Sequence, residues 1–349
     1  MHNSADAYVP IIKLTYCGVQ VDMLMARIPR SYVHKYPNLL TDINKYPISE
    51  KELKCMNGYR TSLYLRRNIS KYSNFQAALK AIKMWARNKG IYSQNYSYLG
   101  GAAFSIMLAK ICQLYPNYSA LQLLDRFFFI YANWVWTMPV MLETIDYPSA
   151  TEDEMTIYTP FYPFINAGHG VTKITSYITK KYFKAASQLI QEINKGRKTW
   201  KDLFDPISFF DEYRYFLEIS VMSKTEDDFI PWKGNIQSKL RKFIKFFEMQ
   251  HDFPQGIELN PYPRAFDCPS KNPNYSICVK YFMGIKASSS SPLNDFCYID
   301  FSQPVKDFLN VLESYPHIEK APKFINIGFK CVNKDNIEAS ILADQTSYE

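Results

Sequence analysis

The spacing of the apolar residues changes twice along the chain, and this change restricts the fold more than any other feature of the sequence. Between residues 8 and 30 apolar side chains alternate with others, which is typical of strands. From about 31 to 200 they recur at helical spacing. After Pro206, strand and helix patterns follow in the order β-α-β-β-α-β. That order is the split βαβ unit, so we expect a four-stranded sheet backed by two helices.

Each part predicts particular elements. Cys17-Gly18 is the expected turn of a β-hairpin that belongs to a larger sheet, because two strands alone are marginal in water. In the helical part, Ser73 is the expected cap of a helix, and a second helix follows Gly100-Gly101. The other expected helices cover 121–136, ending near 137, and 182–194. In the last part we expect strands at 214–222, 257–264, 276–286 and 324–332 and helices at 232–249 and 304–314, with Tyr215, Leu217, Ile219 and Val221 facing inward.

Composition narrows the functional classes. The formal net charge of +8 favours a polyanionic partner such as nucleic acid or acidic lipid. The 7 Cys are scattered without a C-x-x-C pair, which argues against a disulfide framework or a zinc site and favours a reducing compartment. The most apolar run, 127–142, contains Asn133 and Pro139 and is shorter than the roughly 18 apolar residues of a membrane span. No signal peptide or membrane partner is expected.

Asp22 lies within the apolar run VDMLMAR at the end of the hairpin. It has two interpretations, a solvated aspartate on the outer face of a sheet or a metal ligand. Two-metal chemistry needs several carboxylates that converge on the ions. The sequence contains no D-x-D motif, so Asp22 by itself predicts an incomplete metal site.

Lys83, Tyr92 and Gly100-Gly101 form a second candidate site. A surface lysine is usually only solvated. A helix that opens with two small residues, however, lets a phosphate approach its free N–H groups and its positive dipole end. A lysine and a tyrosine hydroxyl nearby would complete an anion cradle.

Basic residues gather in the last third of the chain. Lys239, Arg241, Lys242 and Lys245 fall on one expected helix, and Lys280, Phe282 and Lys286 on the outward face of one expected strand. Such a pattern fits neutralisation of a nucleic-acid backbone together with base stacking, or else a solvated helix face and an ordinary amphipathic strand. The aromatic RNP1 consensus is absent, so stacking in the manner of an RRM is not expected.

Five segments resemble, in order and approximate spacing, the eukaryotic nuclear poly(A) polymerases. They are ADAYVPIIKLTYCGVQVDMLMAR (5–27), MNGYR (56–60), AIKMWARNKGIY (81–92), LGGAAFSIMLAKICQLYPN (99–117) and MTIYTPFYP (155–163). The resemblance extends more weakly into 205–335, where the split βαβ order is similar to the RNA-binding domain of that family.

The resemblance implies an α+β chain with four parts: the last strands of a nucleotidyltransferase palm (1–30), a helical middle domain (31–204), an RNA-binding domain (205–335) and a tail (336–349). It implies a nuclear, monomeric enzyme that transfers AMP from ATP to the 3′ end of RNA with two Mg²⁺ (or Mn²⁺) ions. The implied partners are ATP, RNA and the mRNA cleavage and polyadenylation factors.

The resemblance also assigns roles to individual residues. Asp22 matches the third catalytic and metal-binding aspartate, and we expect the other two upstream of Met1, so that this chain alone is inactive. Lys83 and Tyr92 match contacts to the ATP triphosphate, and Gly101-Ala102 matches a Gly-Val pair at the helix start.

Base and RNA contacts follow in the same way. Asn57 matches an asparagine near the 3′ nucleotide of the primer. Gln94 replaces an asparagine beside the adenine, and the neighbouring Asn95 could substitute for it. Ala167 to Val171 also departs from the family pattern, in a region near the base. The residues expected to contact RNA elsewhere are Lys239, Arg241, Lys280 and Lys286.

Two other interpretations stay open. The chain could be a noncatalytic RNA-binding scaffold of the 3′-processing machinery, which the missing D-x-D favours and the retained Asp22, Lys83 and Tyr92 disfavour. It could also be a noncanonical adenylyl- or uridylyltransferase. The split βαβ unit after the helices argues against that class.

Overall fold

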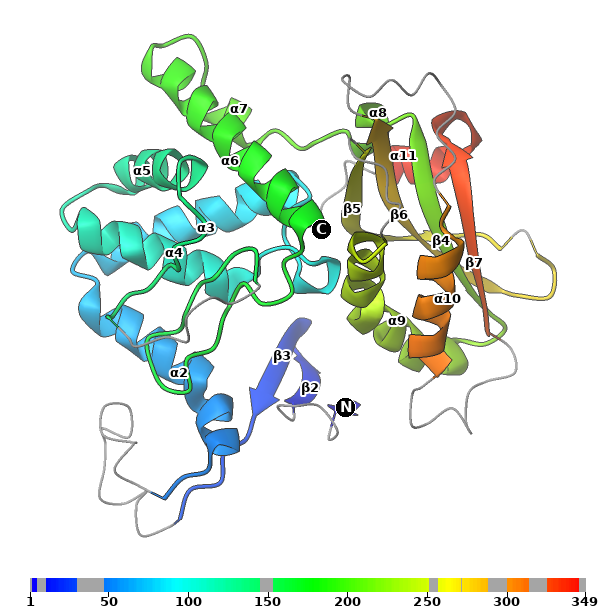
Figure 1. The fold of residues 1–349 in the computed structure, drawn as a ribbon, viewed down its shortest axis with the longest axis horizontal. Coiled ribbons are helices and arrows are strands. Elements are labelled where there is room, and N and C mark those ends of the chain that lie inside the picture. Colours follow the sequence, from blue (N-terminus) through cyan, green and yellow to red (C-terminus); the bar gives the residue numbers. More distant parts are fainter. Residues whose placement is uncertain are drawn as a thin grey trace.

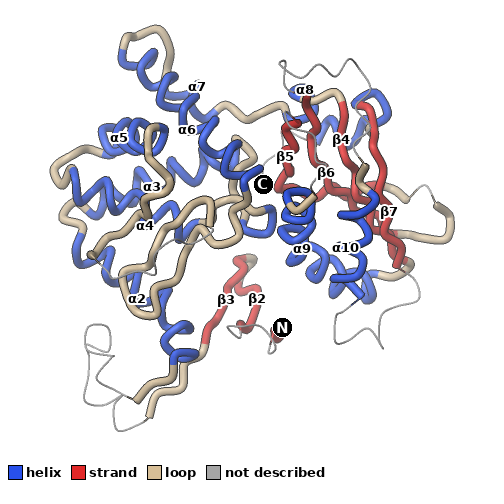
Figure 2. Tube along the Cα trace, in the orientation of Figure 1, coloured by secondary structure: helices blue, strands red, loops and turns tan. Residues whose placement is uncertain are grey.

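The computed structural model describes residues 2–4, 11–29, 47–144, 153–250, 257–270, 272–287, 300–313 and 325–344. Figure 1 shows a helical part on the left, a sheet with its helices on the right, and a small hairpin at the lower centre. Figure 2 shows that the strands are gathered in the hairpin and in the sheet on the right. The described residues therefore form an α+β fold, as the sequence predicts.

The hairpin is formed by β2 (Ile11–Tyr16) and β3 (Val19–Leu24), which pair antiparallel. Cys17 and Gly18 both have positive φ, 49° and 78°, a conformation that fits a tight turn between two strands. The predicted turn is confirmed. A further strand, β1 (His2–Ser4), pairs with the other edge of β2 and was not predicted.

Helices form the next part of the chain. They are α2 (Glu50–Asn68), α3 (Tyr72–Asn88), the 3-10 helix η2 (Gln94–Tyr96), α4 (Gly101–Leu114), α5 (Ala120–Ala132), α6 (Lys173–Asn194) and α7 (Trp200–Phe204). Their apolar stripes share one core, in which Trp85 of α3 packs against Phe128 of α5 and Phe183 of α6. The expected helix start at Gly100-Gly101 is confirmed.

Three predicted helix ends are wrong. Helix α3 begins after Lys71, so Ser73 lies inside its first turn and does not cap it. Helix α5 ends at Ala132, because the chain turns there and the Trp134 indole donates a hydrogen bond to the Met138 carbonyl. Helix α6 begins at Lys173, nine residues before the predicted 182, because Thr172 caps it.

The last part contains the predicted β-α-β-β-α-β order. Its elements are β4 (Tyr215–Ser223), α9 (Glu226–Glu248), β5 (Ile257–Cys268), β6 (Ile277–Ala287), α10 (Ser302–Glu313) and β7 (Ile325–Asn333). The strands are antiparallel in the order β5-β6-β4-β7, so β4 lies between the two strands that come last in the chain. The predicted split βαβ unit is confirmed.

Both faces of this sheet are covered, although the sequence predicts a cover on one face only. Helices α9 and α10 pack on one face, where Phe243 meets Phe308 with ring centroids 4.8 Å apart. On the other face the short helices α8 (Phe209–Glu212) and α11 (Ala339–Asp344) enclose a second apolar cluster that contains Phe210 and Phe282.

Because both faces of the sheet are covered, strand β4 buries residues on both of its faces. Leu217, Ile219 and Val221 are buried as predicted, but Tyr215 is 36% exposed and the prediction that it faces inward is wrong. Phe216, from the opposite face, is fully buried instead.

Helix α9 also joins the sheet to the helical part. The Glu248 carboxylate at its end accepts a hydrogen bond of 2.8 Å from the backbone N–H of Ile174, in the first turn of α6. A single apolar core includes residues of both parts. Among the helices that the structure describes, none has the length and apolar character needed to cross a membrane.

Candidate functional site

The start of α4 lies under the two side chains that the sequence places nearby. A Cβ built on Gly101 would lie 2.8 Å from the Tyr92 hydroxyl oxygen and 3.3 Å from Lys83 Nζ. Lys83 comes from α3, and Tyr92 from the segment between α3 and η2. The structure therefore brings together three residues from different elements, as the predicted anion cradle requires.

The first turn of α4 offers donors to a ligand. Its N-cap is Gly100, which has no side chain that could accept hydrogen bonds from the free N–H groups of the turn. The turn also contains no acidic residue. The positive end of the helix dipole adds to this preference for an anion. Ala102, the next residue of the turn, is exposed.

Lys83 is held close to the helix start without a neutralising partner. It is half-buried, and within the described part of the chain no acidic side chain forms an ion pair with it. Burial lowers the pKa of the Lys83 ammonium, and the neighbouring Arg87 guanidinium lowers it further. A bound anion would favour the charged form of Lys83 and so oppose the lowering of its pKa.

Two neighbours fix the Tyr92 ring. The ring stacks on Phe104 of α4, with centroids 6.0 Å apart and planes 6° apart. The Arg87 guanidinium carbon lies 5.0 Å from the centroid of the Tyr92 ring. Arg87 follows Lys83 by one helical turn, so its place beside the cradle could have been found from the sequence, and we did not assign it.

Gln94 connects the cradle to the loop around 167. A Cβ on Gly100 would lie 3.0 Å from Cγ and Cδ of Gln94, so this side chain covers Gly100. Its Nε2 donates a hydrogen bond of 3.4 Å to the Ala167 carbonyl. The two positions at which the sequence departs from the family near the base, Gln94 and 167–171, are thus neighbours. Asn95 is exposed.

The loop at 167 is fixed by Gly168. A Cβ at this position would lie 2.0 Å from the Met155 carbonyl oxygen, so the two segments can approach only because the residue is glycine. Asn166 supports the same approach, since its Oδ1 accepts from the N–H groups of Ile157 (2.9 Å) and Gly168 (2.8 Å).

Asn57 and Arg60 hold α2 to the segment 161–163. Asn57 Nδ2 donates to the Pro163 carbonyl at 2.9 Å, and Arg60 Nη1 donates to the Tyr162 carbonyl at 2.7 Å. The two side chains are 3% and 2% exposed. Asn57 therefore has a structural contact that the sequence did not reveal, and its role near RNA stays a prediction.

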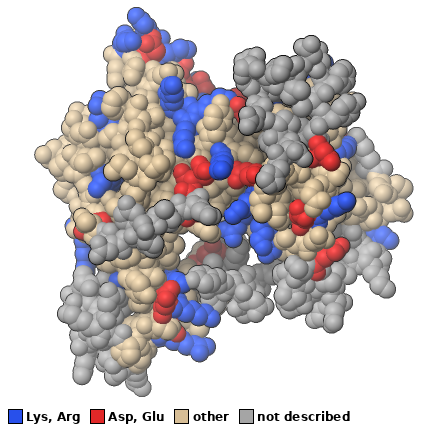
Figure 3. Space-filling model, in the orientation of Figure 1, with Lys and Arg blue, Asp and Glu red and all other residues tan. Residues whose placement is uncertain are grey.

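The basic residues of α9 lie near the loop at 167–171. A Cβ on Gly170 would lie 3.8 Å from Arg241 Nη1. Burial lowers the pKa of Lys239, as do the charges of Lys242 and Arg241. Figure 3 shows a hollow near the centre of one face of the molecule, with Lys and Arg side chains along part of its rim and Asp and Glu side chains close by. An RNA contact by Lys239 and Arg241 stays a prediction.

The predicted outward face of β6 is partly wrong. Lys280 and Phe282 are 6% and 1% exposed, because α8, α11 and their apolar cluster cover this face. The Lys280 ammonium pairs with Glu338 at 2.7 Å and with Glu218 at 3.3 Å. Lys286 is exposed as expected. Whether either lysine contacts RNA is untested.

Asp22 is an exposed residue of β3 and is the register partner of Lys13. Among the described residues there is no group of three or more His, Cys, Asp and Glu that could hold a metal ion. The role of Asp22 as a metal ligand stays a prediction.

The described residues thus form a helical part that carries the cradle, followed by a C-terminal split βαβ part. Three family models match it in order: the poly(A) polymerase nucleotidyltransferase domain at residues 1–68, the poly(A) polymerase central domain at 74–206, and the poly(A) polymerase predicted RNA binding domain at 208–275. The chain belongs to the poly(A) polymerase family.

Named relatives agree with this assignment. A poly(A) polymerase of Dictyostelium discoideum is 30% identical over 96% of this chain and 43% of its own length. The Candida albicans poly(A) polymerase PAPalpha is 34% identical over 75% of this chain and 49% of its own. The nuclear poly(A) polymerase 1 of Arabidopsis thaliana is 28% identical over 90% of this chain and 45% of its own length. The chain thus spans about half the length of the curated relatives it matches.

Proposed function

We propose that this chain carries the nucleotide- and RNA-positioning part of a polynucleotide adenylyltransferase, which transfers AMP from ATP to the 3′ end of RNA. One observation carries the proposal: Lys83 Nζ and the Tyr92 hydroxyl converge on the uncapped start of α4 at Gly101. Membership of the poly(A) polymerase family supports the choice of nucleotide and acceptor.

The cradle suits the triphosphate of ATP. Its components are an ammonium group that has no acidic partner among the described residues, a phenolic hydroxyl and the N–H groups of a helix start. Each of them can donate hydrogen bonds to phosphate oxygens. The Arg87 guanidinium adds a second positive charge beside Tyr92. Held in this way, the triphosphate would be oriented for attack, and its developing negative charge would be stabilised.

Base and RNA contacts are assigned around this cradle. The Gln94 amide, which covers Gly100, is placed to meet the adenine together with Asn95. The RNA would follow the basic residues Lys239 and Arg241 of α9, of which Arg241 lies beside Gly170 in the loop at 167–171. Ala102, Asn57 and Lys286 are the remaining proposed contacts. Lys280, which is buried between Glu218 and Glu338, is not proposed as an RNA contact.

The reaction uses two Mg²⁺ (or Mn²⁺) ions in the family that the chain resembles, and such ions activate the 3′-hydroxyl and stabilise the leaving pyrophosphate. We assign Asp22 as one of their ligands. The described residues do not supply the remaining ligands.

We also propose that the protein acts in the nucleus, together with mRNA cleavage and polyadenylation factors. The relatives from Arabidopsis thaliana are named nuclear poly(A) polymerases. The net charge of +8 fits an RNA partner.

The test is extension of an RNA primer by the protein expressed from its complete native reading frame, with each of the four nucleoside triphosphates in turn. We expect AMP to be added in preference to the other nucleotides. Asp22→Ala should abolish extension with little loss of RNA affinity. The control Asp227→Ala, at an exposed site in α9, should leave both extension and RNA affinity unchanged.

Two results of this assay would contradict the proposal. Preferential addition of UMP would favour a uridylyltransferase. RNA binding without extension under all conditions, unaffected by Asp22→Ala, would favour the noncatalytic scaffold.

A further inference from the structure

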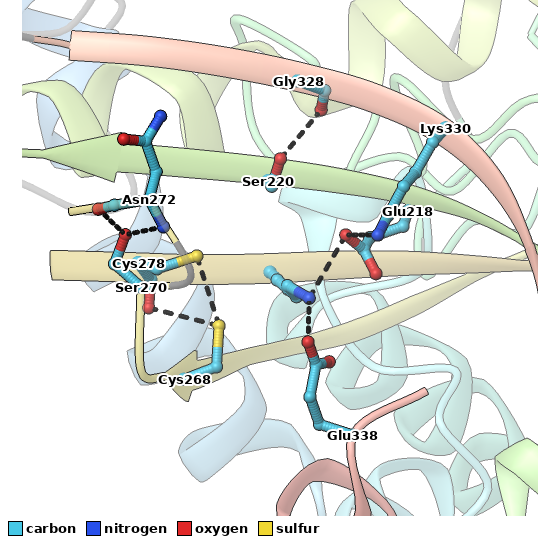
Figure 4. Close-up of polar contacts among 10 residues, drawn as sticks. Glu218, Ser220, Cys268, Ser270, Asn272, Cys278, Gly328, Lys330 and Glu338 are labelled. Carbon is cyan, nitrogen blue, oxygen red and sulfur yellow. Dashed lines mark hydrogen bonds and ion pairs between the residues drawn. The ribbon is translucent and has the colours of Figure 1, made fainter. Parts of the chain in front are cut away.

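Two cysteines that lie ten residues apart in sequence meet at the end of the β5–β6 hairpin. Cys268 is the last residue of β5 and Cys278 the second residue of β6, and the two are register partners. Their sulfur atoms are 3.2 Å apart, and the Cys268 thiol donates a hydrogen bond to Cys278 Sγ. Figure 4 shows both side chains pointing toward each other.

The backbone geometry at this pair already permits a disulfide. Direct partners on antiparallel strands have Cα atoms about 4.5 to 5.5 Å apart. Disulfides span Cα separations of about 4.4 to 6.8 Å. Closing the bond therefore needs the sulfur atoms to approach to about 2.05 Å, which side-chain rotation can supply without moving the strands.

The surroundings favour a thiolate at Cys278. The hydrogen bond from Cys268 lowers the pKa of the Cys278 thiol, and the positive charge of Lys280 lowers it as well, while burial and the carboxylates of Glu218 and Glu338 oppose this shift. Lys280 follows two residues later on the same face of β6 and pairs with the carboxylates of Glu218 and Glu338. Cys278 is 5% exposed, while Cys268 is only half-buried and gives small molecules access to the pair.

We propose that Cys268 and Cys278 form a thiol oxidation site that a peroxide converts to a reversible intrachain disulfide. The Cys278 thiolate attacks one peroxide oxygen, the O–O bond breaks, and a sulfenic acid forms as water leaves. Cys268 then attacks the Cys278 sulfur, the S–O bond breaks and a second water leaves. Two thiols and one hydrogen peroxide thus give one disulfide and two waters, and a dithiol reverses the change.

The disulfide would tie the ends of β5 and β6 together and remove the free Cys278 thiol near Lys280. This site lies in the part of the chain that matches the RNA-binding domain model, at residues 208–275, and extends just beyond it. It is independent of the cradle at Gly101, so its test does not depend on adenylyl transfer.

Peptide mapping of the full chain tests the proposal. Trypsin cleaves after Arg264, Lys271 and Lys280, so the two cysteines fall on separate peptides, AFDCPSK and NPNYSICVK. After treatment with hydrogen peroxide and blocking of free thiols, we expect these peptides to be recovered joined and lighter by two hydrogens than the reduced pair. Dithiothreitol should restore both free thiols.

Variants give matched controls. Cys268→Ser and Cys278→Ser should each abolish the joined peptides, while Cys17→Ser, at an exposed cysteine of the hairpin turn, should leave them unchanged. The proposal is overturned if the peroxide-treated wild-type chain gives sulfinic acids or intermolecular links at these positions in place of the joined peptides. It is equally overturned if Cys17 is oxidised while both peptides keep free thiols.

Discussion

Replacement of Lys83 by methionine should change ligand affinity and protein stability in opposite directions. Lys83 is half-buried beside Arg87 without an acidic partner among the described residues, so its charge is unfavourable in the free protein. Methionine has a similar length and no charge. We therefore expect the variant to unfold at the same temperature as the wild type or at a higher one.

The expected loss of affinity follows from the contact that Lys83 would make. A hydrogen bond between a charged donor and a phosphate contributes about 1.5 to 3 kcal/mol. Its removal should raise the Kd for ATP about 10- to 150-fold. Because the ammonium lies 3.3 Å from the Cβ position of Gly101, the loss should also appear with inorganic triphosphate, which has no base.

Isothermal titration calorimetry of the full chain measures this affinity, and a thermal melt measures the stability. Lys80→Met is the matched control, since Lys80 lies on the same helix, is exposed and carries the same charge. Equal affinities for Lys83→Met and Lys80→Met would refute the cradle. A large fall in melting temperature for Lys83→Met would refute the electrostatic argument, because it would mean that the lysine stabilises the free protein.

Three further variants test other contacts. Gly101→Ala places a methyl group 2.8 Å from the Tyr92 hydroxyl oxygen, so we expect about tenfold weaker ATP binding by calorimetry with an intact helix, since alanine favours helices. Asn57→Ala leaves the buried Pro163 carbonyl without its donor, so the free energy of unfolding, measured in urea, should fall by about 1 to 3 kcal/mol. The exposed control Gln76→Ala should leave this free energy unchanged. Lys280→Met leaves the buried carboxylate of Glu218 without its buried cation, so the same free energy of unfolding should fall by about 3 to 5 kcal/mol. A variant as stable as the wild type would contradict the ion-pair assignment.

The ion pairs of Lys280 also predict a pH dependence. Burial lowers the pKa of Lys280, but the hydrogen bond to Glu338 and the charge of Glu218 outweigh it, and the pKa is raised overall. The stabilisation is thus complete below the unfolded pKa of about 10.4 and is lost as the pH rises through the folded value. The difference in unfolding free energy between wild type and Lys280→Met should therefore shrink above about pH 10.4. A difference that stays constant to higher pH would contradict this cause.

The sequence predicted the elements whose signals are local. The alternation around Cys17-Gly18, the glycine pair before α4 and the strand-helix order after Pro206 each arise from residues close together in the chain. The end of α5 at Ala132 was missed because it depends on a single contact of the Trp134 indole. The start of α3 after Lys71 was missed because no side-chain cap marks it in the sequence. Very short helices such as α8, with Phe209–Glu212, leave too few residues to show a period.

The candidate site was predicted where the residues have a chemical reason to meet, and missed where only the three-dimensional register brings them together. Lys83, Tyr92 and Gly101 share a preference for an anion, which the sequence already indicates. The pairing of Cys268 with Cys278 depends on the register of β5 and β6, which no spacing rule supplies. The buried place of Lys280 depends on helices α8 and α11, which come from distant parts of the sequence.

The cradle also depends on the sheet part of the chain, through Tyr98. This residue precedes Leu99, Gly100 and Gly101 and is 1% exposed, and its hydroxyl donates a hydrogen bond of 2.7 Å to Asn260 Oδ1 on β5. Asn260 in turn donates to the Tyr213 hydroxyl at 2.7 Å. Since a buried, fully bonded polar network holds its members in one arrangement, the approach to α4 is positioned by β5 as well as by the helical part. A change in how the two parts pack would therefore reach the first turn of α4, the turn that we propose binds phosphate. The sheet part would then influence the proposed nucleotide binding even without touching the nucleotide.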